Sequence, residues 1–235
     1  MANGSSADAV SSDRLPVALS VSPARVALDA PAARTIQLRN VGVGRVVVDV
    51  APKPVDRHAT ALRWLSIRPS RVLLRAGSRA LVTLRARASR GVRPGDHQLL
   101  VLLIARPLER SRVAVRIRLG VRVRVRMPGR IVRRLDVRGL RVRRQRARTR
   151  VLLLSVANAG NVTEELRGRV SLILRRGAKT VARLQPRGPS ELYPGARTTL
   201  AARYAGRVRG LVTAVLQVRS GGQQPAFVRR YRIRL

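Results

Sequence analysis

A chain of 235 residues is long for one β-sandwich and sufficient for two of about 100 residues each. Its hydrophobic fraction of 45 % can build a core in both, and it is almost wholly aliphatic, since the chain holds one Trp, three Tyr and one Phe. The absence of cysteine excludes disulfides, thiolate chemistry and cysteine-based metal sites, and the formal net charge of +39 favours anionic partners.

The first fourteen residues are small and polar and predict a disordered leader without the apolar segment of a signal peptide. The longest apolar stretches, such as Leu99–Ala105, are too short to span a bilayer. We expect no transmembrane segment in this chain. An extracellular or cell-wall location is the first expectation for it, and the cytoplasm is the alternative.

From residue 15 onward, short apolar runs alternate with turn residues at the spacing of a sandwich. Helical periodicity is hard to find, so the sequence predicts an all-β fold. The first domain, residues 15–127, is expected to hold seven strands: Val17–Val21, Arg34–Arg39, Gly44–Ala51, Ala61–Ile67, Arg79–Ala86, His97–Ala105 and Arg112–Met127. Trp64 is expected to pack in the core of this domain.

The last of these runs alternates strictly between aliphatic residues and arginine. Successive side chains of a strand point to opposite faces, so the aliphatic residues from Val113 to Val125 predict a core face. The opposite face is predicted to be a row of arginines: Arg112, Arg116, Arg118, Arg122, Arg124 and Arg126. Such a row either is a solvated face that keeps an edge strand from aggregating or binds a polyanion.

A second cycle of strands begins after Met127-Pro128-Gly129, a linker candidate, and predicts a second domain at residues 128–235. The two halves share an early strand that ends in Asn-x-Gly, at Asn40 and at Asn158. Its expected strands are Ile131–Val142, Thr149–Ala157, Leu166–Leu174, Thr180–Leu184, Thr198–Arg203, Gly210–Val218 and Ala226–Ile233. The chain is therefore expected to form two tandem immunoglobulin-like β-sandwiches.

The densest charge follows the linker, where the first hairpin of the second domain carries Arg143, Arg144, Arg146, Arg148 and Arg150. Because this hairpin follows the arginine row directly in sequence, we expect one continuous basic surface near the domain junction. An anionic cell-wall polymer is the first candidate ligand. The positive charge makes nucleic acid an alternative ligand, but the aromatic residues are scattered and give no platform on which bases could stack. Codon bias is a competing explanation of the arginine excess, because Lys53 and Lys179 are the only lysines.

The turn motifs of the second half, Asn158-Ala159-Gly160-Asn161-Val162 and Leu192-Tyr193-Pro194-Gly195, resemble those of immunoglobulin-like domains in Gram-positive surface proteins. The layout is most similar to the WxL-interacting proteins of cell walls. The first half, with Trp64-Leu65-Ser66-Ile67 and Pro94-Gly95-Asp96-His97, is similar to the same family and to pilus-chaperone and major-sperm-protein sandwiches. These resemblances imply binding to wall polymer and partner proteins, without catalysis.

Catalytic and metal-binding constellations are not recognisable, so we expect no enzyme, no cofactor and no metal site. His58 and His97 fall in separate loops, Asp49 and Asp56 are too loosely spaced to complete a metal site with them, and Glu164-Glu165 is an adjacent pair rather than a facing one.

Three functions follow as hypotheses. The first is a non-enzymatic surface or secreted module that holds wall polymer or a surface protein. The second is a polyanion or nucleic-acid binder that uses residues 112–150. The third is a chaperone-like protein that captures an extended strand by β-augmentation.

Overall fold

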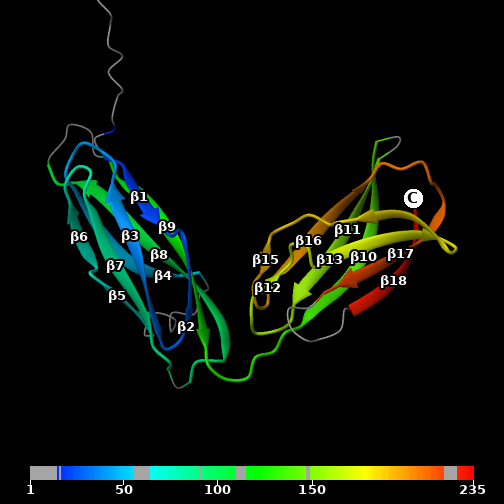
Figure 1. Cartoon of the computed structure of the whole chain (residues 1–235), viewed down its shortest axis with the longest axis horizontal. Coiled ribbons are helices and arrows are strands. Elements are labelled where there is room, and N and C mark those ends of the chain that lie inside the picture. Colours follow the sequence, from blue (N-terminus) through cyan, green and yellow to red (C-terminus); the bar gives the residue numbers. More distant parts are fainter. Residues whose placement is uncertain are drawn as a thin grey trace, which may run out of the picture. The chain divides into compact units, whose positions relative to one another are not determined.

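The computed structural model describes residues 15, 17–55, 64–89, 91–109, 115–146, 149–219 and 227–235. Every regular element in these ranges is a β-strand, which confirms the all-β prediction (Figure 1). The chain divides into two compact units. The first unit consists of the described residues up to Val92 together with His97–Met127. The second unit consists of Arg93–Asp96 together with Pro128–Leu235. No helix in the described ranges is long and apolar enough to cross a membrane.

The first unit is a sandwich of two sheets, with strand orders β1-β3-β7-β5 and β2-β9-β8-β4-β6. Its strands are β1 (Leu19–Ser22), β2 (Arg25–Asp29), β3 (Ala32–Asn40), β4 (Val46–Pro54), β5 (Leu65–Arg68), β6 (Arg71–Leu74), β7 (Arg79–Ala86), β8 (Gly95–Pro107) and β9 (Ile117–Met127). The inward residues of both sheets form one aliphatic core, in which Ile36, Leu84, Val101 and Val123 are fully buried. Trp64 is buried in the same core, as predicted, with its ring 5.7 Å from that of His97.

The second unit is a sandwich with strand orders β10-β11-β16 and β14-β13-β17-β18, completed by the short pair β12-β15. Its strands are β10 (Leu135–Arg146), β11 (Thr149–Asn158), β12 (Glu164–Glu165), β13 (Val170–Arg176), β14 (Lys179–Leu184), β15 (Glu191–Leu192), β16 (Arg197–Tyr204), β17 (Leu211–Val218) and β18 (Phe227–Arg234). Its core is separate from that of the first unit. Two immunoglobulin-like sandwiches in tandem are thus the fold of this chain.

The shared Asn-x-Gly motif is a buried clamp in both sandwiches. Asn158 donates from Nδ2 to the carbonyls of Val162 (2.7 Å) and Leu192 (2.8 Å) and accepts from the amide of Gly160 (2.9 Å). Asn40 makes the equivalent bonds to Gly44 (2.7 Å), Arg75 (3.1 Å) and the amide of Gly42 (3.0 Å). The bonds from the amides of Gly42 and Gly160 close a turn around the Asn side chain. The same side chain also ties a strand end to a segment 34 or 35 residues further along the chain.

Several strands of the first unit differ from those predicted from the sequence: β6 at Arg71–Leu74 was not predicted, and the strand expected at Ala61–Ile67 begins at Leu65. The segment after Val21 was not predicted as a strand, yet Arg25–Asp29 forms β2 in the sheet opposite to that of β1. The arginine strand is described as a strand only from Ile117. Several residues named in the sequence analysis lie outside the described residues: the leader at 1–14, Asp56, His58, Arg112 and Arg148.

Candidate functional site

One edge of the first domain is only half paired. β2 pairs in parallel with β9 over Arg122–Arg126 alone. Within the described residues, no strand pairs with that side of β9 between Ile117 and Val121. Figure 1 shows β1 and β9 together at this edge, where the chain crosses from one sheet to the other between β1 and β2.

Every second residue of this segment directs its peptide groups away from β8, toward the unpaired side. The amide of Arg122 donates to the carbonyl of Ala24 (3.1 Å), and the carbonyl of Arg126 accepts from the amide of Ala30 (2.9 Å). Peptide groups alternate in direction along a strand, so those of Arg118 and Gly120 face the same side, ahead of the start of β2. They can accept a further strand by main-chain hydrogen bonding.

Beside this edge the sandwich core is incompletely covered. The inward residues of β9 from Val121 to Met127 are fully buried, whereas Ile117 and Leu119 are only partly buried, as is Val115 just before the strand. Across the seam between the sheets, Leu19 and Val21 of β1 are also only partly buried. These five partly exposed aliphatic side chains pack against one core at the edge where β1 contacts β9, and we call them the apolar seam.

The predicted arginine row lies on the opposite face of β9. Arg116, Arg118 and Arg122 are exposed, and Arg124 and Arg126 are half-buried. Strand alternation thus places the charges away from the core, as the sequence analysis expected. The row remains a candidate polyanion surface.

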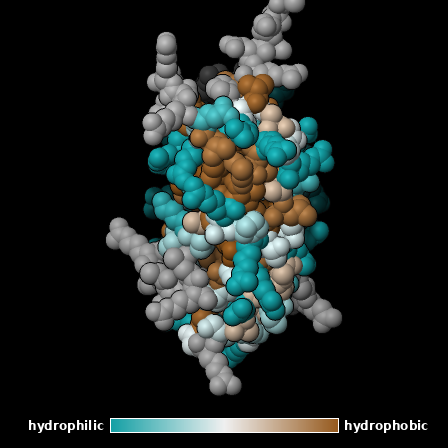
Figure 2. Space-filling view, turned by 90° about the vertical axis from the view of Figure 1, so that its left-hand side faces the viewer, coloured by the Kyte–Doolittle hydropathy of each residue, from teal (hydrophilic) through white to brown (hydrophobic). Residues whose placement is uncertain are grey.

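The same outer face carries apolar side chains next to this row. Leu100, Leu102 and Ile104 of β8 are half-buried and belong to neither core, and Leu73 of β6 is exposed. Figure 2 shows an apolar area framed by hydrophilic side chains on the side of the molecule where β6 lies in Figure 1. An outer sheet face of this composition suits contact with a protein.

The second group of predicted arginines is distant from the linker. Arg143 and Arg144 are exposed near the end of β10, and the side chain of Arg146 is outside the described part of the structure. The twelve residues of β10 carry the chain about 40 Å from its start beside the linker. Within the second domain, β10 therefore separates this hairpin from the linker along the length of a strand. The continuous basic surface expected near the domain junction stays a prediction.

Arg150, the last member of that group, is not a surface residue. It is buried, and its Nη1 donates to the carbonyl of Thr149 at 3.4 Å. Burial, followed by the positive charges of Arg209 and Arg144, lowers the pKa of its guanidinium from the ordinary value. Its placement fits a role within the domain better than direct contact with a polymer.

Comparison with solved structures identifies the architecture. The Class 5 fimbriae chaperone CfaA superposes with a TM-score of 0.56 at 11 % identity, over 91 % of this chain and 98 % of CfaA. The YadV chaperone gives 0.50 at 13 % identity, over 92 % and 99 % of the two chains. This chain has the fold of the fimbrial chaperones.

A further match is the complex of the SafA pilin with the SafB chaperone of Salmonella enterica, with a TM-score of 0.50 at 16 % identity, over 91 % of this chain and 96 % of that one. The pilus-chaperone resemblance is confirmed at the level of fold, and the WxL-interacting layout is not confirmed. No protein-family profile and no curated protein matches the chain.

The alternation of β9 was predictable from its sequence, but its unpaired edge was not. The short run Arg25–Asp29, in which the buried Val26 and Leu28 alternate with exposed residues, could have indicated the strand β2 but not its partner. Five residues are enough to pair with half of β9 and leave the other half open. Across the described ranges, no group of three His, Asp or Glu residues could hold a metal ion.

Proposed function

We propose that this protein is a non-catalytic, chaperone-like module that captures an extended strand of a partner subunit at the unpaired edge of β9. The observation that carries the proposal is the coincidence of outward peptide groups at Arg118 and Gly120 with the apolar seam. A partner strand with alternating aliphatic residues can pair with the edge and place those residues against Leu19, Ile117 and Leu119.

The comparisons support the class of partner. The matched SafB chaperone is described in complex with a pilin, and another match, with a TM-score of 0.51, is described as a chaperone–tip adhesin complex. By analogy, the partner of this chain is a subunit of a surface fibre, and the site of action lies outside the cytoplasm. Strand capture thereby replaces wall-polymer binding as the leading function, because no wall-specific feature of comparable detail accompanies the arginine row.

The test is the substitution Arg118→Pro. Proline removes the amide that faces the unpaired edge, and edge positions of this kind tolerate proline because the lost amide has no partner within the sheet. We expect at least tenfold weaker binding of a synthetic peptide of about ten residues with alternating aliphatic and serine residues, measured by fluorescence anisotropy.

The matched control is Arg118→Ala, which removes the same charge and keeps the amide. It is expected to bind the peptide within about twofold of the parent chain. Equal weakening in both variants would show that the arginine side chain, rather than the strand edge, holds the peptide. Unchanged binding in Arg118→Pro, with native hydrogen-exchange protection in β8, would refute capture at this edge.

A further inference from the structure

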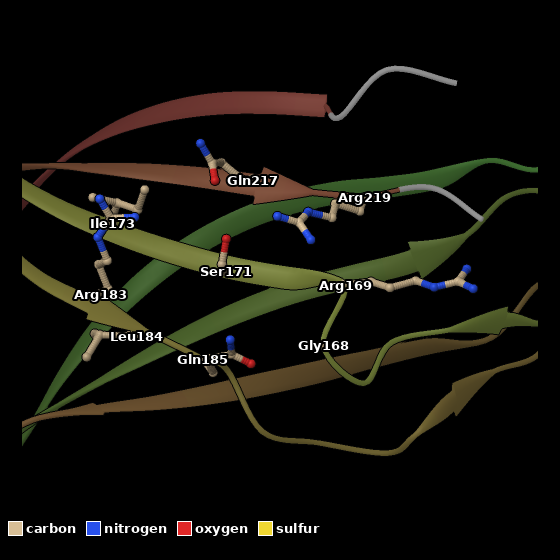
Figure 3. Close-up of a pocket in the computed structure, with 9 residues that line it drawn as sticks. All are labelled: Gly168, Arg169, Ser171, Ile173, Arg183, Leu184, Gln185, Gln217 and Arg219. Carbon is tan, nitrogen blue, oxygen red and sulfur yellow. The ribbon is translucent and has the colours of Figure 1, made fainter. Parts of the chain in front are cut away.

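The outer face of the second domain is hollowed between β13, β14 and β17. The hollow has a volume of about 360 Å³ and is lined by Arg169, Ser171, Arg183, Gln185, Gln217 and Arg219, together with Ile173 and Leu184 (Figure 3). Ordinary alternation explains its position, because Ser171, Ile173 and Gln217 are the outward residues of strands whose inward residues are buried.

Strand register orders these side chains across the sheet. Ser171 stands opposite Gln217 on β17, and Ile173 stands opposite Arg183 on β14. The amide of Arg219 donates to the carbonyl of Arg169 (2.8 Å), one row further along. In Figure 3, Ser171 and Gln217 lie between Arg183 on one side and Arg219 on the other. By strand geometry, the Cα atoms of these two arginines are about 16 Å apart, two strands and four residue steps from each other.

The three arginines of the hollow differ in whether an acidic side chain neutralises them. Arg169 is paired with Glu165 (3.3 Å) and Glu164 (3.8 Å). Arg183 and Arg219 form no ion pair with the described residues, and the hollow has no acidic lining residue. The hollow therefore presents two guanidinium groups separated by uncharged hydrogen-bonding side chains.

A neighbouring hollow shares part of this lining. A second hollow of about 600 Å³ shares Arg183, Leu184 and Gln185 with the first and adds Arg187 and Arg203. Arg187 lies beside β16, since its main chain forms a bridge with Ala201. The two hollows thus meet at the β14 residues Arg183 and Leu184 and at Gln185, and we refer to them together as the groove.

We propose that this groove binds an acidic oligosaccharide. Guanidinium groups pair with carboxylate or sulfate oxygens by charge-assisted hydrogen bonds, and Ser171, Gln185 and Gln217 can donate to and accept from sugar hydroxyls. The lining holds no aromatic ring on which a nucleobase could stack, so single-stranded nucleic acid fits less well. This site lies on the second domain and is independent of strand capture at β9.

The decisive comparison uses two double variants with the same loss of charge. Arg183→Gln/Arg219→Gln alters the groove, and Arg39→Gln/Arg79→Gln alters an exposed arginine pair on β3 and β7 of the first domain. With a heparin-derived tetrasaccharide at physiological salt, calorimetry is expected to show at least tenfold weaker binding for the groove variant. The control is expected to change binding less than about twofold. Equal effects would overturn the site, because binding would then depend on net charge alone.

A third variant separates shape from charge. Ser171→Leu keeps every arginine and fills the centre of the hollow, and leucine is compatible with an outward strand position. Loss of tetrasaccharide binding with an unchanged melting temperature is expected, and parent-like binding would contradict the proposal. Binding of the strand peptide should be unaffected, so failure here leaves the proposed chaperone function intact.

Titrations with three ligands show which anionic group the groove recognises. Oligogalacturonate of the same length tests carboxylates, the heparin tetrasaccharide tests sulfates, and sodium sulfate tests the bare anion. The proposal expects at least one oligosaccharide to bind at least tenfold more tightly than inorganic sulfate. Equal affinity for sulfate alone would refute recognition of a sugar.

Discussion

Asn158→Ala is expected to lower the free energy of unfolding of the second domain by about 3 kcal/mol. The side chain is buried, and its loss leaves the carbonyls of Val162 and Leu192 and the amide of Gly160 without their bonds. Each unsatisfied buried group costs about 1–3 kcal/mol. Water can reach part of the loop, so the cost of each of the three groups is expected at the lower end of this range. Urea unfolding, followed by hydrogen exchange in β11 and β16, measures the effect.

Asn40→Ala is the corresponding substitution in the first domain, because the Asn40 side chain joins the end of β3 to the loop after β6. It is expected to reduce protection in β3 and β7 and leave β11 and β16 unchanged. If either variant lowered hydrogen-exchange protection equally in both domains, the two clamps would not stabilise their domains independently. A loss below about 0.5 kcal/mol would mean that water replaces these bonds without cost.

The second large effect is expected for Glu164→Ala, at about 2 kcal/mol. The Glu164 side chain is 5 % exposed and lies 3.3 Å from Arg133 and 3.8 Å from Arg169. Its removal leaves two guanidinium groups facing a site without its anion. Those arginines are 32 % and 30 % exposed, so solvent screens part of the repulsion and the cost falls below that of a wholly buried pair.

Glu165→Ala is the matched control. The two residues are adjacent in β12, and Glu165 contacts the same Arg169 at 3.3 Å, but its side chain is 60 % exposed. An exposed pair of this kind contributes less than about 0.5 kcal/mol. Chemical unfolding of both variants under the same conditions gives the comparison, and equal losses would contradict the assignment of the stabilisation to the buried carboxylate. Since Glu164 pairs with Leu192, a clamp partner of Asn158, a double variant is expected to be non-additive.

Much of the fold follows from local pattern. The alternation of Val121, Val123 and Val125 with arginine determined which face of β9 is buried, because a strand has a period of two. The two Asn-x-Gly motifs revealed the repeat of the domain, and the aliphatic composition with frequent turns indicated sandwiches rather than helices. These features depend on residues close together in the chain.

The candidate sites depended on pairings that cross long stretches of sequence. Nothing local specifies that Arg25–Asp29 leaves the sheet of β1 and pairs with half of β9, yet this crossing creates the unpaired edge and the apolar seam. Likewise, Arg183 and Arg219 are 36 positions apart and come to one hollow only because β13 pairs with both β14 and β17. By itself the sequence determined strands, faces and the sign of the charge. Tertiary structure alone decided which edges stay open and which charges gather, because the choice of partner strand depends on the packing of the whole sheet.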